Sequence, residues 1–255
     1  MAHPETFAYA LVLILARVMP ATLWIPLFAD RILGSGMLRM MLLVLLACGL
    51  YPLTAQAGTP DSLSDWGVAL VRESMIGAVL GMGFGAPYFA VMACGEMIDN
   101  QRGATIANTI DPASGVEASP LASFLSLCWT TVFATGGGLV AFLTSLADSY
   151  RCLPLGMPFS LDAATTLSVS TQFGQSLLLG SLAALPAVVA MLLTEMLLGV
   201  LSRFAPQLNA FSLALTVKSL IACAVLLAAF GSHFFERFDR LLDVPAHEIA
   251  KACGR

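Results

Sequence analysis

The chain has 255 residues, of which 58% are hydrophobic and only 11% are charged, and its mean hydropathy is +0.86. Soluble domains carry about 25% charged residues, so this composition indicates an integral membrane protein. The formal net charge of −4 and the lack of any run of Lys or Arg argue against nucleic-acid binding, which needs clustered basic residues.

Six apolar segments follow one another along the chain, and a helix needs roughly 20 residues to cross a bilayer. Backbone groups in hydrocarbon must be bonded internally, and no alternating barrel pattern is present, so the segments are expected to be helices. The predicted fold class is therefore all-α, with about six long hydrophobic helices arranged as hairpins. The segments are Phe7–Phe28, Met37–Ala57, Gly67–Cys94, Leu121–Ala147, Gln175–Leu201 and Leu208–Phe235.

Charged residues interrupt several of these segments. Arg17 lies near the middle of the first, Glu73 lies in the third, Glu195 in the fifth and Lys218 in the sixth. A charge at the centre of a bilayer costs about 2.5 to 3.5 kcal/mol on insertion scales. These side chains are therefore expected to meet protein partners or water.

Glycines in the third and fourth segments predict close helix packing and a helix break. Gly77, Gly81 and Gly85 recur every four residues, which makes a flat stripe that another helix can approach closely. A Gly-rich dinucleotide loop is the competing interpretation, but that motif needs a preceding strand. The run Gly136–Gly138 is expected to pack against a neighbour or to kink its helix.

A polar stretch follows the third apolar segment. Glu96, Asp99 and Arg102 or Gly103 recur at helical spacing, which extends the helix beyond its apolar part until Gly103 ends it. The residues Asn108–Pro120 then contain Asp-Pro, Ser-Gly and Ser-Pro turn signals. The stretch is either a solvated loop or a segment that is buried in a polar interior or lines an aqueous path.

The fifth and sixth segments are joined by the short connection Arg203–Asn209, which contains Pro206. Proline disfavours helix at its own position and at the one before it, so an antiparallel hairpin is expected. A turn near Pro206 and Gln207 places Glu195 and Lys218 at equal depth. They are candidates for a buried ion pair, and the alternative is that each charge meets another subunit.

The sequence contains no recognisable enzyme motif. His3, His233 and His247 are far apart, and HExxH, GxSxG and Walker-type phosphate loops are absent. The six cysteines are scattered without metal-ligand spacing. No enzymatic activity, catalytic residue, metal site or cofactor is therefore expected.

Two motif blocks resemble the FliR/SctT family (YscT/HrcT/SpaR), the export-apparatus membrane proteins of type III secretion systems. The first is GEMIDNQRG followed by IDPASG and SPLASFL, and the second is RFAPQLNAFSLALTVKS. The run GGGL followed by LADSY is more similar to the injectisome branch, because the flagellar branch usually has His where Leu139 follows Gly138.

The resemblance implies a subunit of a hetero-oligomeric export gate in the bacterial inner membrane. In that gate a single copy would assemble with the other membrane components, an autocleaving switch protein would dock, and unfolded secreted polypeptides would pass through. The resemblance also divides the chain into an N-terminal helical part, residues 1–170, and a C-terminal helical hairpin with a short tail, residues 171–255. Each part is similar to a different gate component.

The resemblance assigns roles to particular residues. The loop 105–119 would help to plug the closed channel, with Ile110, Asp111, Pro112 and Gly115 at its centre. Residues of the first motif block would lie at a polar interface or in the lumen: Glu96, Asp99, Gln101, Arg102 and Gly103. Residues of the hairpin turn would help to hold subunits together: Arg203, Pro206, Gln207 and Asn209.

An independent secondary transporter or ion channel is the alternative function. In that case the intramembrane charges would form an ion relay or a substrate site. The two halves show no convincing internal repeat, which argues against such a fold. A transporter would also work alone or as a homo-oligomer, whereas a gate subunit needs different partners.

Overall fold

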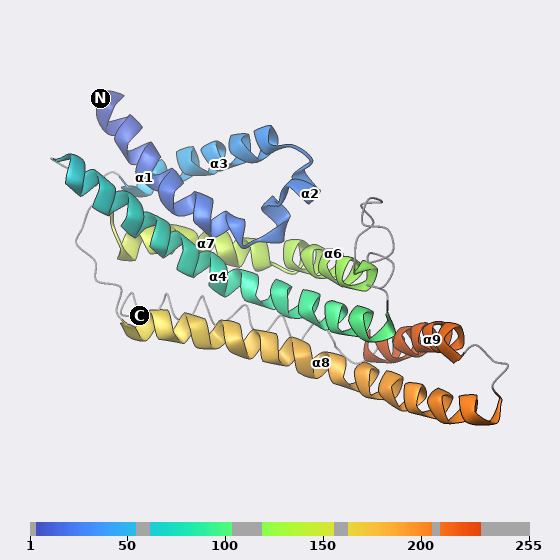
Figure 1. Ribbon diagram of the computed structural model, residues 1–255. Coiled ribbons are helices and arrows are strands. Elements are labelled where there is room, and N and C mark those ends of the chain that lie inside the picture. The colour runs from blue at the N-terminus through green and yellow to red at the C-terminus, as the bar shows by residue number, and fades with distance from the viewer. Residues whose placement is uncertain (1–3, 55–61, 104–118, 156–162, 206–209, 231–255) are drawn as a thin grey trace. The chain divides into compact units, whose positions relative to one another are not determined.

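The structure, a computed structural model, describes residues 4–54, 62–103, 119–155, 163–205 and 210–230 (Figure 1). Within these ranges the regular structure is helical and no strand occurs, so the all-α prediction is confirmed. The longer helices are α1 (Pro4–Leu23), α3 (Gly36–Leu50), α4 (Leu63–Arg102), α6 (Pro120–Thr135), α7 (Gly138–Cys152), α8 (Ala163–Phe204) and α9 (Ala210–Phe230). Short helical turns lie at η1 (Pro26–Phe28), α2 (Asp30–Leu33) and η2 (Tyr51–Thr54).

Five of the six predicted segments each correspond to one long helix, and the fourth is divided into α6 and α7. The two helices are bent by 63° at the Gly136–Gly137 turn, where Gly137 has a φ of 93° that glycine adopts without steric cost. The glycine run thus breaks the fourth segment, one of the two outcomes expected for it. Helix α4 also extends beyond its apolar part to Arg102, as the polar spacing predicted.

Three helical stretches of the described residues are long and apolar enough to cross a membrane. They are Gly36–Thr54, Ser64–Arg102 and Ser170–Phe204. The bent pair α6 and α7 passes the same criteria together, so it forms a fourth candidate span that is broken in the middle. A helix rises about 1.5 Å per residue, so the 19 residues of Gly36–Thr54 match the roughly 30 Å hydrocarbon core of a bilayer, whereas the other two stretches, of 39 and 35 residues, are longer than that core is thick.

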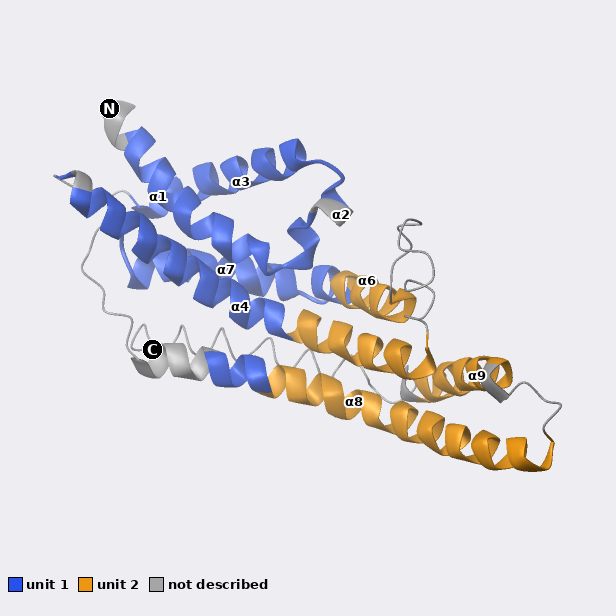
Figure 2. Ribbon diagram, in the orientation of Figure 1, with its two compact units in different colours: residues 1–86, 132–174, 240–255 blue, residues 87–131, 175–239 orange. Residues whose placement is uncertain are grey.

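The chain forms two compact units that do not follow one another along the sequence (Figure 2). Unit 1 comprises residues 1–86, 132–174 and 240–255, and unit 2 comprises residues 87–131 and 175–239. Both α4 and α8 contribute one part to each unit. The predicted division into residues 1–170 and 171–255 is a different one, because it rests on the similarity of each part to another gate component. That division stays a prediction.

In unit 1 the glycine stripe of α4 packs directly against α1 and the turn that follows it. A Cβ atom on Gly77 would collide with the carbonyl group of Arg17, and one on Gly81 would collide with the backbone of Ala21. A Cβ on Gly85 would lie 2.5 Å from the carbonyl oxygen of Trp24. Because these backbones leave no room for a side chain, the contact depends on glycine.

The apolar core of unit 1 forms around α1, α4 and α7. The rings of Phe84 and Phe142 meet edge to face with centroids 5.6 Å apart, a favourable aromatic geometry. Leu13, Ile14 and Leu146 are also fully buried. This core fixes the helices that carry the polar residues described below.

Unit 2 uses glycine at two further close contacts. A Cβ on Gly180 of α8 would collide with the carbonyl group of Ala90 on α4. A Cβ on Gly95 of α4 would collide with the backbone of Ala122 near the start of α6. The C-terminal part of α4 therefore packs closely against both α6 and α8.

Candidate functional site

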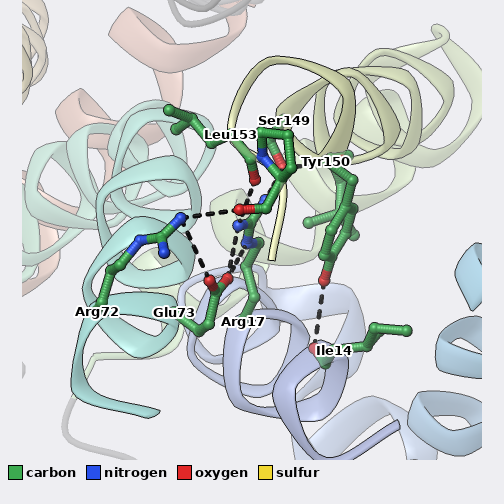
Figure 3. Close-up of polar contacts among 9 residues, drawn as sticks. Ile14, Arg17, Arg72, Glu73, Ser149, Tyr150 and Leu153 are labelled. Carbon is green, nitrogen blue, oxygen red and sulfur yellow. Dashed lines mark hydrogen bonds and ion pairs between the residues drawn. The ribbon is translucent and has the colours of Figure 1, made fainter. Parts of the chain in front are cut away.

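A buried ion cluster lies in unit 1, where α1, α4 and the end of α7 meet (Figure 3). Arg17 and Glu73 are fully buried, and the Arg17 Nε donates to Glu73 Oε2 at 2.6 Å. Arg17 Nη1 donates to Ser149 Oγ at 3.1 Å, and Nη2 donates to the carbonyl oxygen of Leu153 at 2.9 Å. The guanidinium carbon also lies 4.2 Å from the centre of the Tyr150 ring. Arg17 thus has charge, hydrogen-bond and cation–π partners.

A second guanidinium group completes this cluster. Arg72 Nη2 donates to the carbonyl oxygen of Pro154 at 2.9 Å and lies 3.7 Å from Glu73 Oε1. The carbonyls of Leu153 and Pro154 lie directly after the end of α7, where the negative end of the helix dipole favours cations. The two arginines therefore fasten the end of α7 to α1 and α4.

The ion cluster of unit 1 is sensitive to the loss of any one of its charged side chains. Two guanidinium groups face one carboxylate, and within the described residues Glu73 Oε1 and Arg72 Nε have no hydrogen-bond partner. Removal of one member of a buried ion pair leaves an uncompensated charge and costs about 3 to 5 kcal/mol. The cluster thus stabilises this helix arrangement only while all its members are present.

In unit 2 the fully buried Asp99 links the end of α4 to the start of α6. Its Oδ2 accepts from the backbone N–H groups of Leu121 at 2.8 Å and Ala122 at 3.2 Å. Its Oδ1 accepts from Arg102 Nε at 2.7 Å. A carboxylate at a helix N-terminus satisfies free N–H donors and interacts favourably with the helix dipole. Asp99 thus caps α6 from a neighbouring helix.

The ion pair expected between the fifth and sixth segments is present in unit 2, but only its lysine is largely buried, so the expectation of a buried pair is wrong for Glu195. Lys218 Nζ on α9 donates to Glu195 Oε2 on α8 at 2.7 Å and to the carbonyl oxygen of Gln101 at 3.3 Å. The Lys218 side chain is 9% exposed, whereas the Glu195 side chain is 55% exposed. Lys218 therefore binds a carbonyl group in the last turn of α4, where a cation is favourable.

The ion cluster of unit 1 and the Asp99 and Lys218 contacts of unit 2 consist of ion pairs and helix-capping hydrogen bonds. No group of three or more His, Cys, Asp and Glu side chains that could hold a metal ion occurs in the part of the chain that the structure describes. The charged groups instead join helices: α1, α4 and α7 in unit 1, and α4, α6, α8 and α9 in unit 2.

Comparison with known proteins identifies the group to which this helical chain is related. Residues 8–243 match the family of bacterial export proteins, family 1. The chain belongs to this family. The result confirms the relationship that the two motif blocks indicated.

Individual members of the family align along most of their length. The chain is 39% identical to the surface presentation of antigens protein SpaR of Salmonella typhimurium over 218 residues, which cover 85% of this chain and 81% of that protein. It is 32% identical to the Yop proteins translocation protein T of Yersinia pestis, with 84% and 83% covered. It is 30% identical to the flagellar biosynthetic protein FliR of Pectobacterium carotovorum, with 93% and 92% covered. The higher identity to SpaR favours the injectisome branch, as expected.

Family membership and the span-like helices together make this chain a multi-pass membrane protein. The predicted interface residues lie at different places within it. Asp99, Arg102 and the carbonyl of Gln101 join the unit 2 contacts, while Glu96 is half-buried on α4. Gly103 ends α4 with a φ of 83°, a common way to stop a helix.

Most of the remaining predicted site residues lie outside the described residues. The exception is Arg203, which is exposed near the end of α8. The turn residues Pro206, Gln207 and Asn209 lie outside the described residues. The same holds for the plug residues Ile110, Asp111, Pro112 and Gly115, so their roles stay predictions.

Sequence reasoning missed the members of the unit 1 cluster that come from α7. Ser149 and Tyr150 belong to the LADSY motif, which served only to distinguish the two branches of the family. The signal available in the sequence was a polar Ser next to an aromatic residue near the end of an apolar helix, because both side chains can bind a cation. Arg17 lies 132 residues from Ser149, so spacing alone cannot pair them.

Proposed function

We propose that this protein is a subunit of a type III secretion export apparatus in the bacterial inner membrane. With other membrane subunits it forms a gated channel for unfolded protein substrates. The observation that carries the proposal is the family match over residues 8–243, together with relatives whose names refer to translocation and flagellar biosynthesis. The multi-pass helical fold supports the same conclusion.

The arrangement of the buried charges supports a structural subunit rather than an enzyme or an independent transporter. Arg17 is bound to Glu73 and to groups at the end of α7, and Lys218 is bound to Glu195 and α4. An ion relay would need charged groups that exchange partners along a path. Groups that each join several helices are better suited to hold an assembly together.

The proposal extends to partners and to the channel closure. The chain is present as one copy among different gate subunits, and the autocleaving switch protein docks on the assembly. The loop 105–119 plugs the closed channel, because a pore wide enough for an unfolded polypeptide must not leak ions at rest. The contacts of Asp99 and Lys218 support this role, since they hold α4 and α6 on either side of that loop.

A secretion assay tests the proposed function. An in-frame deletion in the native host is compared with the same strain carrying the intact gene on a plasmid. The proposal predicts that export of type III substrates into the medium is lost in the deletion strain and restored by the plasmid. Unchanged export without the gene would refute the proposal. Ion or solute flux through vesicles that contain only this purified chain would instead favour the transporter alternative.

A further inference from the structure

We infer that Arg72, at the edge of the unit 1 ion cluster, binds the phosphate group of an anionic phospholipid. The acyl chains of that lipid lie along the neighbouring apolar side of α4, over Val68 and Met75. The inference goes beyond the proposed function, because it requires only that the chain lies in a membrane. All the residues that carry it belong to unit 1.

The first observation is the excess of positive charge in the cluster. Arg17 and Arg72 both face Glu73, so one positive charge is left uncompensated. Among the described residues, Glu73 is the only carboxylate paired with Arg72. Asp65 lies seven residues earlier on α4, about 10 Å along the helix axis, and it accepts a hydrogen bond from Ser62. The described residues therefore supply no anion for the second guanidinium group.

Arg72 also has hydrogen-bond donors that are not used. A guanidinium group has five N–H donors. Within the described residues Arg72 donates only from Nη2, to the carbonyl oxygen of Pro154, and its buried Nε has no acceptor. The side chain is 11% exposed, so it reaches the surface of unit 1. A phosphate group at this point supplies both the missing charge and acceptor oxygens that match the fork of a guanidinium group.

Aromatic side chains mark one end of unit 1. The rings of Phe7 and Tyr51 have centroids 4.8 Å apart. The rings of Tyr9 and Trp66 have centroids 5.2 Å apart. Tyr51 lies in the last turn of the span-like stretch Gly36–Thr54, and Tyr and Trp are enriched where the hydrocarbon core meets the headgroups. The beginnings of α1 and α4 and the end of α3 therefore lie at a membrane boundary.

Arg72 lies within reach of this boundary. It follows Trp66 by six residues, which is about 9 Å along the axis of α4. Side chains on a helix are tilted towards its N-terminus, and a long arginine side chain can extend towards the headgroups in this way. The guanidinium group of Arg72 thus lies near the level at which phosphate groups are concentrated.

The side of α4 next to Arg72 is apolar and exposed. Val68 is 69% exposed and lies four residues before Arg72, and Met75 is 48% exposed and lies three residues after it. This spacing places both on the same side of the helix as Arg72. A free anion in water would leave these apolar side chains uncovered. A phospholipid covers them with its acyl chains and supplies the phosphate.

Photo-crosslinking in the membranes of the native host tests the inference. A photoreactive phenylalanine analogue replaces Val68, and the adducts are identified by mass spectrometry. The share of phosphatidylglycerol and cardiolipin among the lipid adducts is compared with their share in the membrane. An enrichment of about fivefold is expected, which is the effect of one basic side chain near a membrane surface.

A control position and two variants show whether Arg72 causes the enrichment. Leu45 is 70% exposed at the middle of the span-like stretch Gly36–Thr54, so its lipid adducts should have the composition of the membrane. Arg72→Gln should reduce the enrichment at Val68 to the membrane value. Arg72→Lys keeps the charge but not the fork, and it should retain about half of the enrichment.

Three outcomes would overturn the inference. They are lipid adducts at Val68 with the composition of the membrane, an enrichment that persists in Arg72→Gln, and adducts with another protein in place of lipid. If Arg72→Gln fails to assemble, the comparison of Val68 with Leu45 in the otherwise unaltered chain still decides. None of these outcomes bears on the proposed function, which the deletion assay tests separately.

Discussion

Asp99 and Asp148 each pair with an arginine three residues later, but their surroundings differ. Asp99 is fully buried and also caps α6, whereas the Asp148 side chain is 46% exposed and its partner Arg151 is exposed as well. We predict that Asp99→Ala lowers the free energy of unfolding by about 3 kcal/mol or more, because two backbone N–H groups and a cation lose their acceptor. Asp148→Ala should cost less than about 1 kcal/mol.

Thermal unfolding of the two variants in identical lipid nanodiscs measures this difference. The apparent Tm of Asp99→Ala should fall clearly below that of Asp148→Ala. Equal Tm values would show that the capping contact of Asp99 contributes nothing beyond a surface ion pair.

Glu195 and Lys218 are coupled through a hydrogen bond of 2.7 Å, so their substitutions should not be additive. Glu195→Ala leaves a largely buried ammonium group that retains only the carbonyl of Gln101. We predict that this single variant disturbs assembly more than the double variant Glu195→Ala/Lys218→Ala. The measurement is the fraction of tagged chain recovered in the intact complex, and additive damage from the two substitutions would contradict the pairing.

At the scale of helices, α1 and α4 are held together by backbone contact at the glycine stripe. We predict that Gly81→Ala destabilises unit 1 by about 1 to 3 kcal/mol, because its new Cβ collides with the backbone of Ala21. Gly49→Ala on α3 is the control, since open space surrounds that position and alanine favours a helix by about 0.5 to 1 kcal/mol. Denaturation curves in detergent should therefore shift in opposite directions, and a neutral Gly81→Ala would disprove the close contact.

The helices themselves could be predicted from the sequence because their signals are local. Segment length and hydrophobicity locate them, and the glycine run locates the break between α6 and α7. The Glu195–Lys218 pair could also be predicted, because a short hairpin fixes which residues share a depth. Arg17 and Glu73 are 56 residues apart on helices joined by no short turn, so only the packed structure pairs them.

The capping role of Asp99 could not be predicted from the sequence either, because its partners are distant along the chain. Its helical spacing with Glu96 and Arg102 indicated a polar stripe and an interface or lumen role. Its contact with the start of α6 joins residues that are 22 positions apart, and spacing along the chain does not predict such a contact. A helix start at Pro120 was foreseeable, but its neighbour was not.

At the scale of the whole molecule, the proposed gate must seal when no substrate is present. We predict that shortening the loop 105–119 raises ion leakage through the assembled complex, because the plug no longer fills the channel. The measurement is single-channel conductance of the purified complex in planar bilayers. An equal shortening within residues 55–61, which connect η2 to α4, serves as the control. Unchanged conductance in a correctly assembled variant would count against the plug.

The central claim is that this chain works as one subunit of a hetero-oligomeric export gate. Native mass spectrometry of the tagged protein, extracted gently from the membranes of its host, tests that claim most directly. The account predicts a stable complex that contains one copy of this chain and two different small membrane proteins of the secretion apparatus. A monomer or a pure homo-oligomer would contradict it, and the buried charges would then have to be considered as an ion path.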